Sequence, residues 1–250
     1  MFILFSLIIM RMSGAIALNP VFGRTNVPSR VKAAFILVIS LMLYIGPGGI
    51  LVHEPAVMAE YGVMLIKELL FGFTLGFGME LAFLAVRFAS AIMDYSMGLT
   101  MAQVYDPQYN AQMTITTGMY YAFMVMLFLA TNGHLRLLTI FFISCELIPF
   151  GTVTFRPELA QAILLMFRES IAMGLQFAFP LIAMELVAET AVGILMRMIP
   201  QINVFVVNFQ IKIIVGILML LFLFSPMSEK LYVILNGMYQ SLQQIVTLMR

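Results

Sequence analysis

Residues 80–97 read ELAFLAVRFASAIMDYSM, an apolar stretch whose charged side chains are Glu80, Arg87 and Asp94. Positions seven apart lie on nearly the same side of an α-helix, because seven residues miss two full turns by only about 20°. The two acids and the base between them therefore form one stripe, with about 10.5 Å between neighbours along the helix axis. That separation is too long for pairing within the helix, so each charge is expected to find a partner on another helix or in water.

Two interpretations of this stripe stay open. The stripe could line an aqueous pathway or a proton relay, because intramembrane charges often mark such routes. It could instead form salt bridges between helices or between subunits, and this structural interpretation is favoured because ion-pair networks occur at sites that do no chemistry.

The overall composition places the stripe in a membrane protein. The chain has 250 residues, of which 62% are hydrophobic and only 10% charged. A soluble domain must expose most of its residues to water and usually carries about 25% charged residues. Thirteen basic and twelve acidic residues nearly cancel, without a basic tract, so nucleic acid is not an expected partner. The single cysteine, Cys145, excludes an internal disulfide, and no metal-site motif is present.

A polar segment interrupts the apolar sequence directly after the stripe. Residues 98–118, GLTMAQVYDPQYNAQMTITTG, contain no long apolar run, although both flanks are apolar. Asp106 and Pro107 predict a turn, because proline fixes its own φ and biases the residue before it away from the helical region. Irregular backbone cannot face lipid, so a loop at membrane depth must line a cavity. The flanking residues Met97, Met101 and Met113 either fill ordinary gaps or form a deformable seal.

Helices are expected throughout, as one all-α domain over residues 1–250. The best candidate membrane spans are residues 33–52, 118–135 and 213–224, since a span needs about 20 apolar residues. Residues 1–14 have no basic segment before their apolar run and are expected to form a retained first helix. The stretches 58–97 and 157–199 carry charges that should not face lipid. Pro180 should kink its helix or split it in two.

A second group of charges lies in the C-terminal half. Glu185 and Glu189 are four residues apart, on one helix face, where like charges repel. The pair could bind a cation, line an ion pathway or be neutralised by basic residues, for which Arg197 and Lys212 are the plausible partners. No nucleophile, base and orienting group occur together, so an enzyme is not expected.

Two further patterns concern helix packing. Gly72 and Gly76 form a GxxxG pattern, which permits close approach of helix backbones in lipid. A helix starting at Ser225 and Pro226 is predicted to be amphipathic, with an almost uncharged polar face. A helix lying on a lipid surface would carry Lys and Arg on that face, so packing on partner helices or lining a wet interior is favoured.

The order and spacing of several motifs resemble the FliR family, the export-gate subunits of the flagellar type III secretion apparatus, which are related to virulence-system subunits of the SpaR and EscT type. The resemblance extends over nearly the whole chain. It rests on RMSGAIALNPVFGRTNVPSRVK (11–32), GFTLGF (72–77), AVRFASAIMDYSMGL (85–99), DPQ (106–108), TNGHLRLL (131–138) and MRMIPQINVFVVNF (196–209). At Asn208 and Gln210 the family more often has Gly and Pro, which puts the usual local break of this segment in question.

The resemblance implies an assembly of helical hairpins with broken, charge-interrupted helices. Such a subunit would join FliP and FliQ in a conical gate, near FlhB and FlhA, through which unfolded flagellar proteins cross the bacterial inner membrane at the flagellar basal body. Its N-terminal part would resemble FliP and its C-terminal part FliQ, and no cofactor is implied. The segment implied to plug the channel contains Met101, Tyr105, Asp106, Pro107, Gln108, Tyr109 and Met113.

One alternative class of protein remains open. A self-contained polytopic transporter or channel for a small solute or ion would use the charged stripe as its binding site. Purification of the intact protein would discriminate the two, because a transporter stays folded alone or as a homo-oligomer, whereas a gate subunit needs FliP and FliQ.

Overall fold

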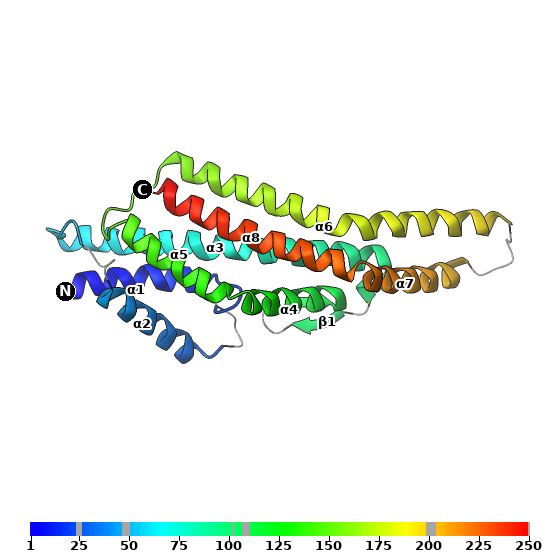
Figure 1. Cartoon of the computed structure of the whole chain (residues 1–250), viewed down its shortest axis with the longest axis horizontal. Coiled ribbons are helices and arrows are strands. Elements are labelled where there is room, and N and C mark those ends of the chain that lie inside the picture. The colour runs from blue at the N-terminus through cyan, green and yellow to red at the C-terminus, as the bar shows by residue number, and fades with distance from the viewer. Residues whose placement is uncertain (24–26, 47–50, 102, 107–110, 199–203, 250) are drawn as a thin grey trace. The chain divides into compact units, whose positions relative to one another are not determined.

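The chain folds into a set of helices and one short strand pair (Figure 1). The computed structural model describes residues 1–23, 27–46, 51–101, 103–106, 111–198 and 204–249, with backbone only at 101, 103–106, 111–113, 196 and 204–207. The elements are α1 (Phe2–Ala17), α2 (Ser29–Ile45), α3 (Met58–Met97), the 3-10 helix η1 (Leu99–Met101), β1 (Gln103–Asp106), β2 (Ala111–Thr114), α4 (Ile115–Ala130), α5 (Gly133–Leu147), α6 (Pro157–Met198), α7 (Val204–Phe222) and α8 (Phe224–Leu248). The predicted all-α membrane fold class is confirmed.

These elements form two compact units. The first unit contains Met1–Phe83, Leu127–Arg168 and Leu235–Arg250, and the second contains Leu84–Met126 and Glu169–Ile234. The long helices α3, α6 and α8 contribute residues to both units. Each unit therefore draws on distant parts of the sequence, and neither corresponds to an N-terminal or a C-terminal half of the chain.

In the first unit, α1 and α2 form a helical hairpin, and α1 packs against α3 at very short range (Figure 1). A Cβ atom on Gly72 would overlap the carbonyl oxygen of Arg11, and one on Gly76 would lie 2.8 Å from the carbonyl oxygen of Ala15. On α1, a Cβ atom on Gly14 would overlap the carbonyl oxygen of Leu69. Backbone cannot move aside as a flexible side chain can, so this approach of the two helices requires glycine.

In the second unit, the core forms around Tyr120 of α4. Its ring meets Phe177 of α6 edge-on with 5.1 Å between centroids, and its hydroxyl donates to the sulfur of Met227 over 2.7 Å. A Cβ atom on Gly174 of α6 would lie 2.7 Å from the carbonyl oxygen of Ala85 of α3. Close backbone contact and aromatic packing thus hold α3, α4, α6 and α8 together within this unit.

The predicted ranking of membrane spans is wrong. The helices long and apolar enough to cross a membrane are Met58–Met97 and Pro157–Leu195, with up to four spans if α4 with α5 and α7 with α8 each count as one. The expected span at 33–52 is the 17-residue helix α2, which ends before Gly46. The expected span at 118–135 is divided at Asn132, whose φ is +56°. The third, at 213–224, extends past the end of α7 at Phe222.

The other helix predictions are confirmed in part. Pro180 does not split α6, which is continuous from Pro157 to Met198, and α7 runs through Asn208 and Gln210. The predicted amphipathic helix forms as α8. The apolar residues of its predicted buried face are buried within this chain, namely Leu231, Ile234, Leu235, Met238, Leu242, Ile245 and, just past the helix end, Met249. Glu229 and Lys230 are exposed in its first turns, whereas the exposed polar residues farther along, Gln240, Gln243 and Gln244, are uncharged.

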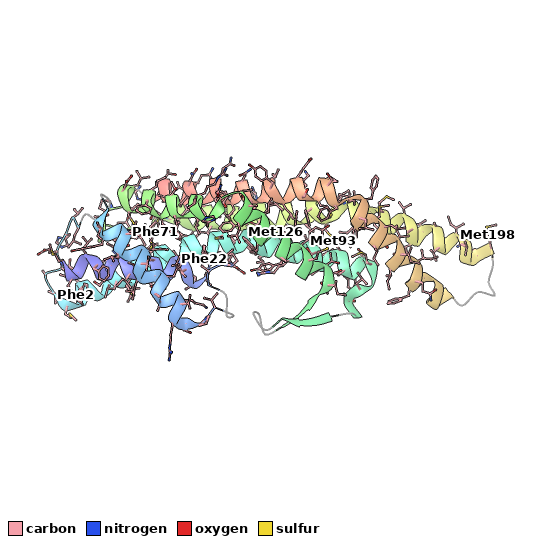
Figure 2. All side chains as sticks on the ribbon, turned by 60° about the horizontal axis from the view of Figure 1, so that its bottom comes forward. Phe2, Phe22, Phe71, Met93, Met126 and Met198 are labelled. Atoms are coloured by element: carbon pink, nitrogen blue, oxygen red, sulfur yellow. The ribbon has the colours of Figure 1, made fainter. Side chains whose placement is uncertain are left out.

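The strand pair was not expected from the sequence. β1 and β2 run antiparallel with Gln103 opposite Thr114 and Asp106 opposite Ala111. Four residues are too few for a strand period to be recognised, whereas the turn between them, at Asp106 and Pro107, was predicted. In Figure 2 the strand pair extends away from α4, into which β2 leads directly.

Replacing Gly72 by Ala should separate α1 from α3, because the new methyl group would meet the backbone of Arg11. Overpacking of this kind costs about 1–3 kcal/mol of stability. Gly62 of α3 is the matched control, since a Cβ atom there meets nothing within 4 Å. Gly62→Ala should stabilise the helix by up to about 1 kcal/mol. Thermal unfolding in detergent measures both changes, and a Gly72→Ala variant as stable as Gly62→Ala would contradict the close packing.

Candidate functional site

The most completely buried charges of the first unit are Arg11 of α1 and Glu68 of α3. The Arg11 Nε–H donates to Glu68 Oε2 over 2.7 Å, and both side chains are 0% exposed. The close approach of α1 to α3 places Arg11, because the backbone carbonyl oxygen of Arg11 lies directly against Gly72. An isolated buried charge would be very costly, so these two residues depend on each other.

Arg11 also holds the C-terminal end of α5. Its two terminal nitrogens donate to the carbonyl oxygens of Ser144 and Ile148 over 2.9 and 3.1 Å. The last carbonyl groups of a helix have no partner within the helix and carry its negative dipole end, so a cation is favourable there. Phe71 and Phe150 stack on the guanidinium with its carbon 4.9 and 4.1 Å from their ring centroids, and Figure 2 labels Phe71 in this interior.

Glu68 holds the segment that follows α5. Its Oε1 accepts from the Gly151 N–H over 3.0 Å. Gly151 has φ of +87°, a conformation that glycine adopts at little cost, and Phe150 forms an isolated parallel bridge with Leu51. One ion pair therefore joins α1, α3, the end of α5 and the segment before α6. This ion pair was not predicted from the sequence, although a lone arginine in the apolar run 1–14 was the available signal.

The predicted stripe on α3 is divided between the two units. Glu80 lies in the first unit and is half-buried. In the second unit, the half-buried Arg87 lies over the ring of Tyr121, with 5.7 Å between the guanidinium carbon and the ring centroid. Arg87 and Asp94 thus meet α4 of the same chain, and the inter-subunit role of the stripe stays a prediction.

Asp94 is fully buried at the start of α4. Its Oδ2 accepts from the Thr117 N–H over 3.3 Å, where the first turn of a helix leaves N–H groups unpaired. Its Oδ1 has no hydrogen-bond partner among the residues the structure describes. Asp94 therefore fixes the point at which the polar segment ends and α4 begins, and it keeps one acceptor unused.

The two acids of the predicted pair on α6, Glu185 and Glu189, have different surroundings. Lys212 of α7 donates to Glu189 over 3.0 Å at an exposed position. Glu185 is 2% exposed, and within the described part of the chain neither of its oxygens has a hydrogen-bond partner. Arg197 is exposed in the last turn of α6, and no ion pair joins it to either glutamate within the described residues.

Most of the predicted plug segment falls outside what the structure describes. Pro107, Gln108 and Tyr109 lie outside the described residues, and so do the side chains of Met101, Tyr105, Asp106 and Met113. Only the backbone pairing of β1 with β2 is seen there. Among the described residues, no group of three or more His, Cys, Asp or Glu side chains could hold a metal ion.

The fold and its buried charges define a polytopic helical membrane protein. The model of the family "bacterial export proteins, family 1" matches residues 2–238, and the chain belongs to this family.

Several members with curated names are similar over most of their length. The flagellar biosynthetic protein FliR of Pectobacterium carotovorum subsp. carotovorum is 32% identical over 89% of this chain and 85% of its own. The protein of the same name from Escherichia coli K12 is 31% identical over 90% and 86%. The secretion system apparatus protein SsaT of Salmonella typhimurium is 27% identical over 70% of each chain.

Replacing Arg11 by Met should leave Glu68 buried without its cation and free two carbonyl groups of α5. Breaking a buried pair from one side costs about 3–5 kcal/mol. Arg11→Lys should not rescue stability, because one ammonium group cannot reproduce the planar fork that reaches three acceptors. Thermal unfolding in detergent and the membrane level of the protein are the measurements.

Arg30→Met is the matched control, since Arg30 is exposed on α2. The double variant Arg11→Met with Glu68→Met should lose less stability than the two single variants together, because it leaves no unpaired charge. Strictly additive losses, or a stable Arg11→Met protein, would show that the pair does not hold the first unit together.

Proposed function

We propose that this chain is a subunit of the flagellar type III protein export gate, located in the bacterial inner membrane at the flagellar basal body. With FliP and FliQ it would form the channel through which unfolded flagellar proteins leave the cytoplasm. Membership of the bacterial export family and similarity to proteins named flagellar biosynthetic protein FliR support this function. The flagellar system is favoured over a virulence system because the FliR proteins of Pectobacterium carotovorum and Escherichia coli are similar at higher identity and over more of the chain than SsaT.

The observation that carries the proposal is the length of the exposed apolar surface of α6. Exposed large hydrophobic residues continue along this helix from Leu164 to Met198. At 1.5 Å per residue they extend over about 51 Å. A bilayer core of about 30 Å can cover only about 40 Å of a helix tilted by 40°. Lipid alone cannot cover this surface, so part of it is expected to be covered by protein.

The charges of α6 lead to the same conclusion. Arg168 and Glu169 are exposed between Phe167 and Leu175, which are themselves exposed apolar residues. A charge facing the bilayer centre costs several kcal/mol, although the amount is disputed. A surface that mixes charges with large apolar side chains is better suited to contact with other subunits, which we assign to FliP and FliQ, with FlhB and FlhA as neighbours in the apparatus.

The polar segment between α3 and α4 is assigned to closure of the channel. It follows the buried Met97 and ends where α4 begins, at the hydrogen bond from the Thr117 N–H to Asp94. It contains a strand pair in a chain that is otherwise helical over the described residues. Exposed strand edges cannot lie in lipid, because their N–H and C=O groups would be unsatisfied. A water-filled passage formed with partner subunits would satisfy them.

Replacing Val187 by Arg should block assembly. Val187 is 63% exposed on α6, so the arginine would put an unpaired charge into the proposed interface with a partner subunit. The expected result is loss of co-purifying FliP and FliQ, with the chain still in the membrane and motility abolished. Val187→Leu is the matched control and should assemble normally. An Arg variant that assembles fully but inserts poorly would instead place this surface against lipid.

Deleting residues 104–110 should leave the complex assembled but make the membrane permeable to ions when the gate is produced without the rest of the apparatus. The physical reason is that the segment implied to close the passage would be missing. Ion leakage and co-purification are measured on the same membranes. If the deleted complex assembles and remains as tight as the parent, the closure lies elsewhere.

A further inference from the structure

A groove of about 440 Å³ lies between α5 and α8 in the first unit, away from the Arg11 network and the polar segment. From α5, Arg136 and Thr139 line it, three residues apart on one face. From α8, Asn236, Gln240 and Gln243 line it together with Tyr239. This is the uncharged polar face that the sequence already singled out on the C-terminal helix, and the proposed export function leaves it without a role.

Among the described residues that line the groove, Arg136 is the charged one. Its terminal nitrogen donates to Asn236 Oδ1 over 3.2 Å, and its guanidinium carbon lies 5.6 Å from the ring centroid of Tyr239. These two contacts orient the planar group. Its other N–H groups make no hydrogen bond within the described part of the chain, so an oriented cation with unused donors borders the groove.

The other lining groups favour a ligand that both accepts and donates hydrogen bonds. Gln240 and Gln243 are exposed amides, each with two N–H donors and one oxygen acceptor. Tyr239 is 7% exposed and its hydroxyl oxygen is buried against Gly133 of α5, so Tyr239 contributes shape to the groove and no hydrogen bond to a ligand. With one positive charge and no acid, the groove suits a group carrying a single negative charge beside polar atoms.

A phosphodiester has this chemistry, because arginine binds phosphate oxygens with two parallel N–H donors. By length and composition, α4 with α5 and α7 with α8 each form a bent helix pair that could cross a membrane, so phospholipid is expected near this surface. Exposed Leu135 directly precedes Arg136, and exposed Leu248 lies one turn beyond Gln244 on α8, where apolar contacts for an acyl chain are available. Pockets between membrane helices with basic residues are known to bind lipid head groups.

We propose that the α5–α8 groove binds the head group of an anionic phospholipid, with Arg136 holding the phosphodiester and Gln240 and Gln243 contacting the polar head-group atoms. A carboxylate from another protein would use Arg136 but would leave two amide side chains of α8 to water. The phosphate of a glycerol head group, with its neighbouring hydroxyls, uses both kinds of groups. This favours the lipid over a protein side chain.

The test uses the full-length chain purified in detergent with the subunits that accompany it. Binding of phosphatidylglycerol is measured by native mass spectrometry and by its effect on thermal unfolding. Arg136→Gln should weaken binding about tenfold, the loss expected for one charge-assisted hydrogen-bonding group. Thr139→Phe should weaken binding similarly by filling the groove, since Thr139 is exposed and lines it. Arg156→Gln is the matched control, because Arg156 is exposed outside the groove.

Two further measurements distinguish a lipid head group from free phosphate and from a protein carboxylate as the bound anion. Phosphatidylcholine, which has the same phosphate but no net charge, should bind more weakly, and millimolar inorganic phosphate should not displace phosphatidylglycerol. Displacement by inorganic phosphate would overturn the lipid assignment. Unchanged lipid binding in Arg136→Gln and Thr139→Phe would also overturn it, and loss of a co-purifying subunit with lipid binding intact would assign the groove to a protein carboxylate.

Discussion

The first unit depends on one buried ion pair, Arg11 with Glu68. Arg11 reaches across to the last carbonyl groups of α5, and Glu68 holds the backbone of Gly151. Each of the three guanidinium nitrogens of Arg11 donates to one acceptor, and two aromatic rings lie over its faces. Such a pair adds little net stability compared with an apolar replacement, but it tolerates no loss of one partner. The ion pair therefore specifies which helices meet and at which position along each helix they do so.

The geometry of this pair explains the glycines around it. Arg11 can reach Glu68 and α5 together because α1 lies almost backbone to backbone on α3, where Gly72 and Gly76 offer no side chain. In a lipid environment the hydrophobic effect does not drive helices together, so close packing and buried polar contacts must do so. The two features act as one constraint: the glycines bring the helices close, and the ion pair sets their register.

Helix type and the buried face of α8 could be predicted from the sequence, because periodicity depends on local spacing alone. The partners of buried charges could not. Arg11 and Glu68 are far apart in sequence, and nothing local links them. The spans were ranked wrongly for a related reason: charges within α3 and α6 were counted against these helices, whereas Glu68 and Asp94 of α3 and Glu185 of α6 are buried in the protein. β1 and β2 are too short for a recognisable pattern, and the plug residues Met101 to Met113 stay a prediction.

The chain completes its surface with other proteins, not with lipid alone. The most direct test is purification of the tagged full-length chain from native membranes in mild detergent, followed by native mass spectrometry of the intact assembly. We expect a hetero-oligomer that contains FliP and FliQ, with little of the chain alone. A stable, folded monomer or homo-oligomer that carries a small solute or an ion across reconstituted vesicles would contradict it.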